Sequence, residues 1–437
     1  MSSIFAKEGS LYEHDIHALY SFLKENLPEL YFVEEFQRAS FYHDEPKFYT
    51  FTAEINVDNE LRLFAGGTAW DKQRAAIKTI FEAVERYSLA RYDFNGSQLS
   101  RHKDIKDKYV SLESFYSFSH SQMHDEQLEP FIAKTNSDLY WTEAQDLINS
   151  EPTFLPAQLI YVPFDLDDKF VRMPITTGAA SGLNREATLG RAMLEVIERD
   201  AFITSYLGAL SGKKLEVKNA TSTLKGILGE LKWYGLKPHM IELESDFPIP
   251  TILTILEDTT SSMPAITMGL KCHPDYNTAI IGSIEESFHS RTWLRHEAAQ
   301  RDENYFHNLN NTPAQSVSDI PDRGLLWSLK ENKHNLNFWL ENTSYKTVDL
   351  EDGNNMNKLE VSDILEILKS KKFDCYVKDL PKIHVGDIAI YSLKVVIPQA
   401  HPLYLDEYMP YLSVERLKQI TDGKVVNIVN TLPQPFL

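Results

Sequence analysis

Residues 81–87 read Phe-Glu-Ala-Val-Glu-Arg-Tyr, and residues 194–200 read Leu-Glu-Val-Ile-Glu-Arg-Asp. Both stretches contain the pattern Glu-x-x-Glu-Arg, at 82–86 and again at 195–199. Mostly apolar residues surround each copy, and a helix that is apolar on most sides is usually buried. Because positions i and i+3 share one face of a helix, each copy presents two carboxylates with a guanidinium beside them. Since a buried carboxylate needs a cation or loses its charge, the repeated pattern predicts a charged site built by two helices.

The composition is that of a large folded protein with an acidic surface. Of 437 residues, 43% are hydrophobic and 11% aromatic, which is ample for a core and argues against disorder. The formal net charge is −19, and so acidic a surface repels nucleic acid and anionic membranes. There is no apolar run of membrane-spanning length and no secretory signal, and two cysteines exclude a disulfide framework or a four-cysteine zinc site. We therefore expect a cytoplasmic protein that binds neither nucleic acid nor membrane.

Helical and strand-like segments alternate along the chain, which favours a mixed α/β fold. We expect a strand at 61–64 that leads through a Gly66-Gly67 turn into a long helix at 72–91. A second long helix is expected at 184–207, with Asn184 as its N-cap, and a third at 276–299. The glycine turn would bring backbone N–H groups to a helix start, where an anion can bind, although a plain tight turn is the simpler interpretation.

The remaining elements are expected from the same patterns. Helices are expected at 11–26, 221–234, 360–371 and 413–420. Strands are expected at 47–56, 156–162, 170–175, 237–243, 249–256, 264–270, 373–379 and 387–397.

No low-complexity linker divides the chain, so we expect one large unit. We divide it into an N-terminal helix and strand segment at 1–60 and a main domain at 61–437. Within the main domain, 303–356 is rich in Asn, Asp and Glu and is interpreted as an insertion or lid. Residues 430–437 form a tail that contains prolines.

The four repeated glutamates allow three interpretations from their residue types alone. In the first, each glutamate pairs with an arginine and the network only joins two helices. In the second, they form a ferritin-like dimetal site, but 286–289 is the single Glu-x-x-His in a suitable setting and the strands contradict a helical bundle. In the third, the carboxylates hold Mg²⁺ together with the phosphate oxygens of a nucleotide. The chain has neither a P-loop nor a Gly-x-Gly-x-x-Gly motif, so this would be a non-standard ATP site.

Three stretches resemble the nucleotide motifs of the YcaO superfamily, whose members use ATP to activate peptide backbone amides. The first runs from Gly66-Gly67-Thr68 through Lys72 to 82–88, and the second runs from 177–182 through 195–202. The third spans 279–291. The chain departs from the usual pattern at 176–177, where many members have Ser-Asn, and at Ala187 and Arg191, where many have Glu and Gln. The resemblance implies the α/β fold of that family.

The resemblance also implies roles for individual residues. It assigns Mg²⁺ to the four carboxylates of the repeated motif: Glu82, Glu85, Glu195 and Glu198. It assigns ATP to six further residues, with the two motif arginines nearest the phosphates: Lys72, Arg86, Glu186, Arg199, Glu286 and Arg291.

The end of the sequence bears on the type of reaction. Family members that form azoline rings tend to end in Pro-x-Pro-x-Pro, whose terminal carboxylate reaches the active site. This sequence ends Pro433-Gln434-Pro435-Phe436-Leu437, with two of the three prolines. Such a segment is stiff and extended, which suits it to threading into a cleft. We therefore expect Pro435 and Leu437 to take part in catalysis, by positioning a base for the attacking side chain.

These implications predict an ATP- and Mg²⁺-dependent cyclodehydratase. Its substrate would be a ribosomally made precursor peptide, in which Cys, Ser or Thr becomes thiazoline or (methyl)oxazoline. The sequence shows no leader-peptide-binding module, so we expect a partner protein of the ubiquitin-activating-enzyme-like or ocin-ThiF-like kind to present the peptide. A flavin-dependent dehydrogenase could then oxidise the ring, and the chain could form a homodimer.

Two alternatives stay open. An enzyme of the same family could install a thioamide or an amidine, with sulfide or an amine as the external nucleophile. The chain could also be a non-catalytic scaffold of a peptide-modifying complex, although a scaffold has no need of four buried charges.

Overall fold

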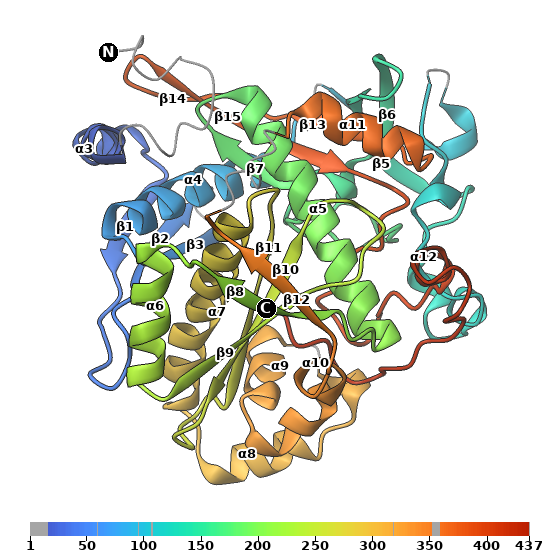
Figure 1. Ribbon diagram of the computed structural model, residues 1–437. Helices are drawn as coiled ribbons and strands as arrows, with labels where there is room; N and C mark the ends of the chain where they lie inside the picture. Colours follow the sequence, from blue (N-terminus) through green and yellow to red (C-terminus); the bar gives the residue numbers. More distant parts are fainter. Residues whose placement is uncertain are drawn as a thin grey trace.

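The computed structural model describes residues 16–58, 60–94, 96–105, 108–317, 319–351 and 359–436. Within these ranges the fold is mixed α/β, as the sequence predicts, with three β-sheets and three long helices (Figure 1).

The three sheets are largely antiparallel. The first has three strands in the order β1 (Val33–Arg38), β2 (Tyr49–Asn56), β3 (Arg62–Ala69). The second has five, in the order β11 (Ile266–Cys272), β10 (Thr251–Asp258), β9 (Leu236–Glu242), β8 (Lys213–Lys218), β12 (Tyr345–Asp349), and β12 is parallel to β8. The third has seven: β4 (Ser97–Arg101), β5 (Asp138–Asp146), β6 (Glu151–Pro156), β7 (Ala179–Gly182), β13 (Tyr376–Asp379), β14 (Ile383–Val385) and β15 (Ile388–Val396).

The long helices are α4 (Lys72–Ala90), α5 (Arg185–Gly208) and α7 (Tyr276–Ala298). A side-chain carboxylate or amide caps the start of each one. Asp71 accepts from the N–H groups of 73 and 74, Asn184 from that of 187, and Asp275 from that of 278. The predicted Asn184 cap is therefore confirmed. The shorter helices are α3 (Ile16–Glu25), α6 (Ser222–Trp233), α8 (Glu303–Asn310), α9 (Ile320–Trp327), α10 (Asn337–Leu340), α11 (Val361–Ser370) and α12 (Glu415–Ile420).

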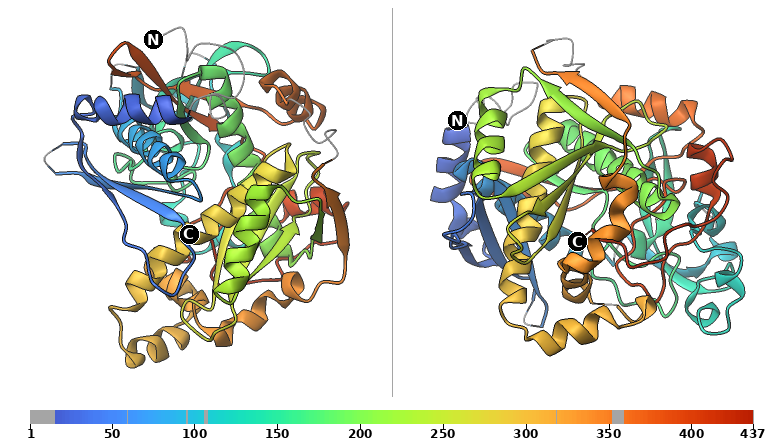
Figure 2. Two further views of the ribbon diagram at one scale, coloured as in Figure 1. Left: turned by 60° about the vertical axis from the view of Figure 1, so that its left-hand side comes forward. Right: turned by 60° about the horizontal axis from the view of Figure 1, so that its bottom comes forward.

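Each long helix lies between two of the sheets. Helix α4 packs on β2 and β3 and also contacts β7 and β15 of the seven-stranded sheet. Helix α5 contacts β7 and β15 on one side and β10 and β11 on the other. Helix α7 packs on β10 and β11 and reaches β3, and Figure 2 (left) shows it in gold between the blue and the yellow-green strands. The three helices are thus fixed relative to one another by the sheets that they share.

Two local predictions are wrong. Gly66 and Gly67 lie inside β3 rather than in a turn, and a Cβ at Gly67 would come within 2.7 Å of Ala75 O and Thr79 N of α4. These glycines therefore allow a helix to approach a strand closely. The strands expected at 156–162 and 170–175 are also absent from the described structure, where 157–159 is a 3₁₀ turn. Here the side-chain amide of Gln158 bonds Val171 N and Lys169 O, which replaces strand pairing.

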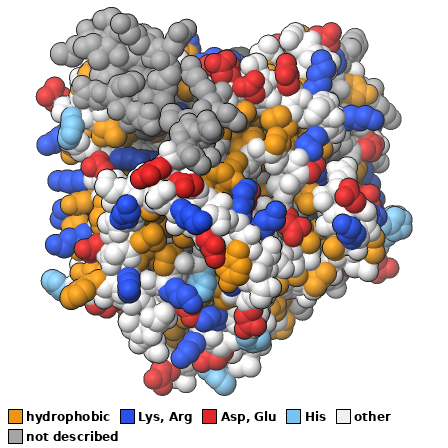
Figure 3. Space-filling model, viewed as in Figure 1, with side chains coloured by type: hydrophobic (Ala, Val, Ile, Leu, Met, Phe, Trp, Pro, Cys, Tyr) orange, Lys and Arg blue, Asp and Glu red, His pale blue; other side chains and the backbone are white. Residues whose placement is uncertain are grey.

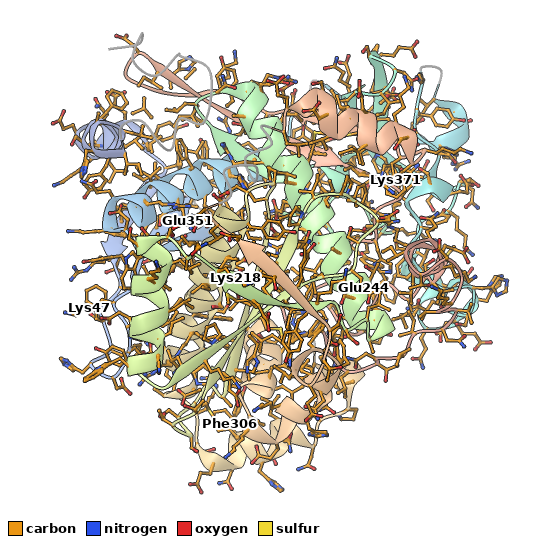
Figure 4. The ribbon with its side chains drawn as sticks, viewed as in Figure 1. Lys47, Lys218, Glu244, Phe306, Glu351 and Lys371 are labelled. Carbon is orange, nitrogen blue, oxygen red and sulfur yellow. The ribbon has the colours of Figure 1, made fainter. Side chains whose placement is uncertain are left out.

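Residues 303–349 contribute both to the surface and to the core. Phe306 on α8 lies at the lower edge of the molecule, and Lys218 at the end of β8 lies beside β12 (Figure 4). Trp327 and Trp339 are 3% and 0% exposed and belong to the largest apolar cluster. The proposed boundary at residue 60 falls between β2 and β3 of one sheet.

The surface has a mixed character. On the face drawn in Figure 3, acidic and basic side chains are interspersed. Among the described residues, no helix is both long enough and apolar enough to span a lipid bilayer.

The contact between α7 and β11 depends on Gly269, because a Cβ there would overlap Ser283 O and Ser287 N. We expect Gly269→Ala to lower the free energy of unfolding by about 1–3 kcal/mol through overpacking. Gly229 in α6 is exposed, and a Cβ there would meet no atom within 4 Å. Gly229→Ala should therefore raise the free energy of unfolding by about 0.5–1 kcal/mol. Urea unfolding of both variants tests this. Equal effects of the two would contradict the packing argument.

Candidate active site

The first Glu-x-x-Glu-Arg motif lies on the inner side of α4. Glu82 forms an ion pair with Arg86, whose Nε lies 2.8 Å and Nη2 2.7 Å from Glu82 Oε1. The other oxygen of Glu82 accepts a hydrogen bond from Gly66 N of β3 at 3.3 Å. Glu85 is half-buried one turn away, and the charge of Glu195 in the second motif raises its pKa.

The second motif lies on α5 and is more deeply buried. Glu198 is 3% exposed, and its Oε2 accepts a hydrogen bond from Cys272 N of β11 at 2.5 Å. Arg199 lies among three carboxylates: its Nη1 is 3.5 Å from Glu198, and its Nη2 is 3.9 Å from Glu195 and 3.3 Å from Glu286. Arg199 therefore links the motif of α5 to helix α7.

Helix α7 adds a fifth carboxylate and a histidine to the cluster. Glu286 accepts a hydrogen bond from Leu270 N at 2.5 Å in addition to its contact with Arg199. His289 lies 3.0 Å from Thr68 Oγ1 through its Nδ1, and burial lowers its pKa. Seven of the predicted site residues thus come together from three helices: Glu82, Glu85, Arg86, Glu195, Glu198, Arg199 and Glu286.

Two lysines complete the cluster, and the sequence prediction missed both. Lys394 of β15 is 2% exposed and donates to Ile175 O and Thr177 O, both at 2.6 Å. Burial lowers its pKa to about 8, against the opposing charges of Glu195 and Glu85. Lys271 of β11 is half-buried, and its charge opposes the rise in the pKa values of Glu195 and Glu198. Each is a single lysine within an otherwise apolar strand. Such a lysine indicates an acidic partner nearby, because its charge is costly to bury alone.

The cluster holds more negative charge than its cations neutralise. Burial raises the pKa of Glu85 to about 8, and the charges of Glu195 and Glu82 raise it further. Burial likewise raises the pKa of Glu195 to about 7 and moves that of Glu198 upward, although Arg199 opposes both shifts. Burial, the main cause of these shifts, favours the protonated carboxylates, and a bound divalent cation would favour their charged form instead.

The residues of the cluster fit a Mg²⁺ ion that is shared with phosphate. Carboxylate oxygens are the donors that Mg²⁺ prefers, and it commonly takes only one or two of them and fills its shell with phosphate and water oxygens. In the described part of the chain, no three acidic, histidine or cysteine side chains converge closely enough to hold an ion alone. The cluster therefore suits a metal ion that arrives with its nucleotide.

Arg199 also fits a phosphate-binding role. Its Nη1 is buried and makes no hydrogen bond, although its side chain is surrounded by carboxylates. The charges of Glu286, Glu198 and Glu195 outweigh burial and raise its pKa, so the guanidinium is always charged. A buried N–H without a partner is costly, and a phosphate oxygen would satisfy it.

Three of the predicted ATP residues lie apart from this centre. Lys72 and Glu186 are exposed in the first turns of α4 and α5. Arg291 is 1% exposed and donates to Glu45 at 2.7 Å, Pro264 O at 2.9 Å and Asp258 at 2.6 Å. Its guanidinium therefore joins α7 to β10 and to the loop before β2. The assignment of these three residues to ATP stays a prediction.

The proline-containing tail reaches the cluster from another direction. Residues 433–436 are buried, and Pro433 O accepts from Trp327 Nε1 at 2.9 Å and from Tyr206 Oη at 3.0 Å. Pro435 lies beside α9 and β11, and the ring of Phe436 lies over Arg199. Leu437, the second predicted catalytic residue, lies outside the described residues.

The acidic cluster, carried by three helices between three sheets, is chemically suited to a metal ion together with phosphate groups. Residues 66–401 match the family model described as YcaO cyclodehydratase, ATP- and Mg²⁺-binding. The chain belongs to the YcaO family. The predictions of the family and of its cofactors, ATP and Mg²⁺, are therefore confirmed.

Solved structures with the same fold support this assignment. A heterocyclase in complex with substrate and cofactor matches 95% of this chain with a TM-score of 0.73 and 16% identity, and the chain spans 57% of that protein's length. YcaO from Methanopyrus kandleri, bound with AMPPCP and Mg²⁺, gives a TM-score of 0.64 at 14% identity, with 91% of this chain and 94% of that one covered. The Escherichia coli microcin synthetase McbBCD complex with pro-MccB17 bound gives a TM-score of 0.62 at 13% identity. The match covers 92% of this chain and 96% of that one.

The raised pKa of Glu85 predicts how stability depends on pH without metal. The folded protein holds this proton up to about pH 8, whereas an unfolded glutamate loses it near its usual value of 4.5. The free energy of unfolding should therefore decrease as pH rises from about 5 to 8. In Glu85→Gln this decrease should be smaller by about 1–3 kcal/mol. Urea unfolding at a series of pH values, in the presence of a chelator, measures both slopes. Parallel slopes for wild type and variant would exclude the assigned shift.

Proposed function

We propose that this protein is an ATP- and Mg²⁺-dependent peptide cyclodehydratase. In this proposal, a Cys, Ser or Thr side chain of a ribosomally made precursor attacks the preceding backbone carbonyl. The amide oxygen leaves with the γ-phosphoryl group, so each ring formed removes one water and yields thiazoline or (methyl)oxazoline.

The observation that carries the proposal is the arrangement around Arg199. Three carboxylates from α5 and α7 surround this arginine, and Glu82 and Glu85 of α4 lie on the neighbouring helix, in a chain that belongs to a family of ATP- and Mg²⁺-binding cyclodehydratases. A purely structural network would pair each acid with a cation, whereas the ion pairs of the described residues include none for Glu85, whose pKa burial raises to about 8. That excess of acid favours the metal-binding interpretation over the structural one and over the scaffold.

In this proposal, acidic and basic side chains of the cluster bind different parts of Mg²⁺–ATP. Glu82, Glu85, Glu195 and Glu198 would hold Mg²⁺, while Arg199 and Arg86 would bind phosphate oxygens. When bound, Mg²⁺–ATP supplies the phosphoryl group that makes the amide oxygen a leaving group. The backbone N–H groups of 66, 270 and 272 keep Glu82, Glu286 and Glu198 in place. Preorganised charges of this kind stabilise phosphoryl transfer without having to reorganise during the reaction.

The peptide substrate and a partner protein are part of the proposal. A structural relative was solved with its substrate, and another is a multi-subunit synthetase with a propeptide bound. We infer that this chain likewise receives its precursor from a leader-binding partner, with a flavin-dependent dehydrogenase as a further candidate partner. The tail would lie next to the substrate and position the base, with Pro435 and Leu437 as the residues assigned to this role.

Removing one metal-holding carboxylate should abolish ATP turnover. We expect Glu82→Gln and Glu198→Gln each to lower precursor-dependent ATP hydrolysis at least about a hundredfold, because one lost charge contact of this type is worth roughly 3 kcal/mol in a transition state. Glu230→Gln, on the exposed face of α6, is the matched control and should keep full activity. A colorimetric phosphate assay with ATP, Mg²⁺, precursor and partner measures this. Full activity of either site variant would refute the metal assignment.

The product distinguishes the candidate reactions. Mass spectrometry of the precursor should show the loss of one water for each modified Cys, Ser or Thr. Replacement of oxygen by sulfur would instead identify a thioamide-forming enzyme, and addition of an amine with loss of water would identify an amidine-forming one. An unchanged precursor without ADP formation would contradict all three and favour the scaffold.

A further inference from the structure

The ring of Phe436 covers the guanidinium of Arg199. The distance from Arg199 Cζ to the ring centroid is 4.1 Å, and Phe436 is 3% exposed. This is the geometry of a cation–π contact that is shielded from water. The tail segment 433–436 therefore touches the arginine at the centre of the carboxylate cluster.

The ring is held in this position from several sides. It packs against Phe202 of α5 with the centroids 5.4 Å apart. Gln434, which is 0% exposed, donates from its backbone N–H to Glu407 at 2.9 Å and accepts from Phe436 N at 2.8 Å. Its side-chain amide also donates to Tyr404 O. The position of the ring is thus fixed by the tail backbone and does not depend on Arg199 alone.

The edge of the Arg199 guanidinium and its face have different partners. Glu195, Glu198 and Glu286 surround its Nη1 and Nη2 atoms at 3.3–3.9 Å, which is longer than close charged hydrogen bonds. These loose contacts attract the arginine without fixing the orientation of its plane. The ring of Phe436 lies over the guanidinium carbon at 4.1 Å and limits the positions that the guanidinium can take. Nη1 makes no hydrogen bond and has Glu198 at 3.5 Å, so a phosphate oxygen would be its first close partner.

We propose that Phe436 is a positioning residue that orients Arg199 for the phosphates of Mg²⁺–ATP, so that seating of the tail and nucleotide binding are coupled. This inference rests on the proposed function of the cluster. Binding coupling is reciprocal. If the seated tail strengthens nucleotide binding, then bound nucleotide must stabilise the seated tail by the same factor.

The test compares two leucine substitutions in the full chain. Phe436→Leu keeps an apolar side chain against Phe202 but removes the aromatic face, and it should weaken binding of Mg²⁺–AMPPCP about three- to thirtyfold, the range of a shielded cation–π contact. Phe338→Leu is the matched control, because Phe338 packs against the same hydrophobic cluster and on Trp339, and the ring contacts of the described residues do not join it to Arg199. It should leave the affinity unchanged. Titration calorimetry gives the affinities, and thermal unfolding without nucleotide compares the stability of the two variants.

A second measurement follows the reciprocal effect. Hydrogen exchange at the amides of 434 and 436, which report tail seating, should slow in wild type when Mg²⁺–AMPPCP binds. The slowing should disappear in Phe436→Leu. A tail that only supports the fold would show no response to nucleotide.

The outcomes separate this inference from the proposed function. Wild-type affinity in Phe436→Leu, or an equal loss in Phe338→Leu, would overturn the inference while the proposed function stands. Tail amides that exchange at the same rate with and without nucleotide would overturn it as well. Failure of the wild-type chain to bind Mg²⁺–AMPPCP at all would remove both proposals.

Discussion

The arrangement of the molecule depends on holding five carboxylates close together inside the protein. Such groups repel one another and lose hydration, and this is why the pKa of Glu85 rises to about 8 and that of Glu195 to about 7. Arg86, Arg199, the buried Lys394 and the half-buried Lys271 offset part of the repulsion. The remaining imbalance suits a site that is completed by a divalent cation and its phosphate ligands.

The fold tolerates this imbalance because the backbone anchors the acids. Each long helix contacts two sheets, so none can move outward without breaking contacts on both sides. Strand N–H groups hold one oxygen of Glu82, Glu198 and Glu286 and leave the other toward the centre. Glycine at 67 and 269 lets α4 and α7 lie directly on their strands, which sets the separation of the motifs. The close packing of the helices on their strands therefore holds the mutually repelling carboxylates in place.

Arg199 joins the chemistry of the cluster to the far end of the chain. It contacts acids from two helices at its edge and the ring of Phe436 on its face. The tail that carries this ring forms hydrogen bonds with Tyr206, Trp327 and Glu407. These residues come from three distant parts of the sequence. A nucleotide site and a substrate-facing tail that share one side chain can influence each other over a short path.

The sequence by itself determined the mixed α/β class, the three long helices, the Asn184 cap and the family, because periodicity, capping residues and motif residues are local signals. It also marked the acids that meet at the centre. Only the tertiary structure decided which cations join them: Lys394 and Lys271 come from strands whose place depends on sheet pairing, and Arg291 is drawn away to Glu45 and Asp258. The glycine pair was misjudged because its constraint, an adjacent helix, is not local. Long-range packing settles such contacts, and local sequence does not encode them.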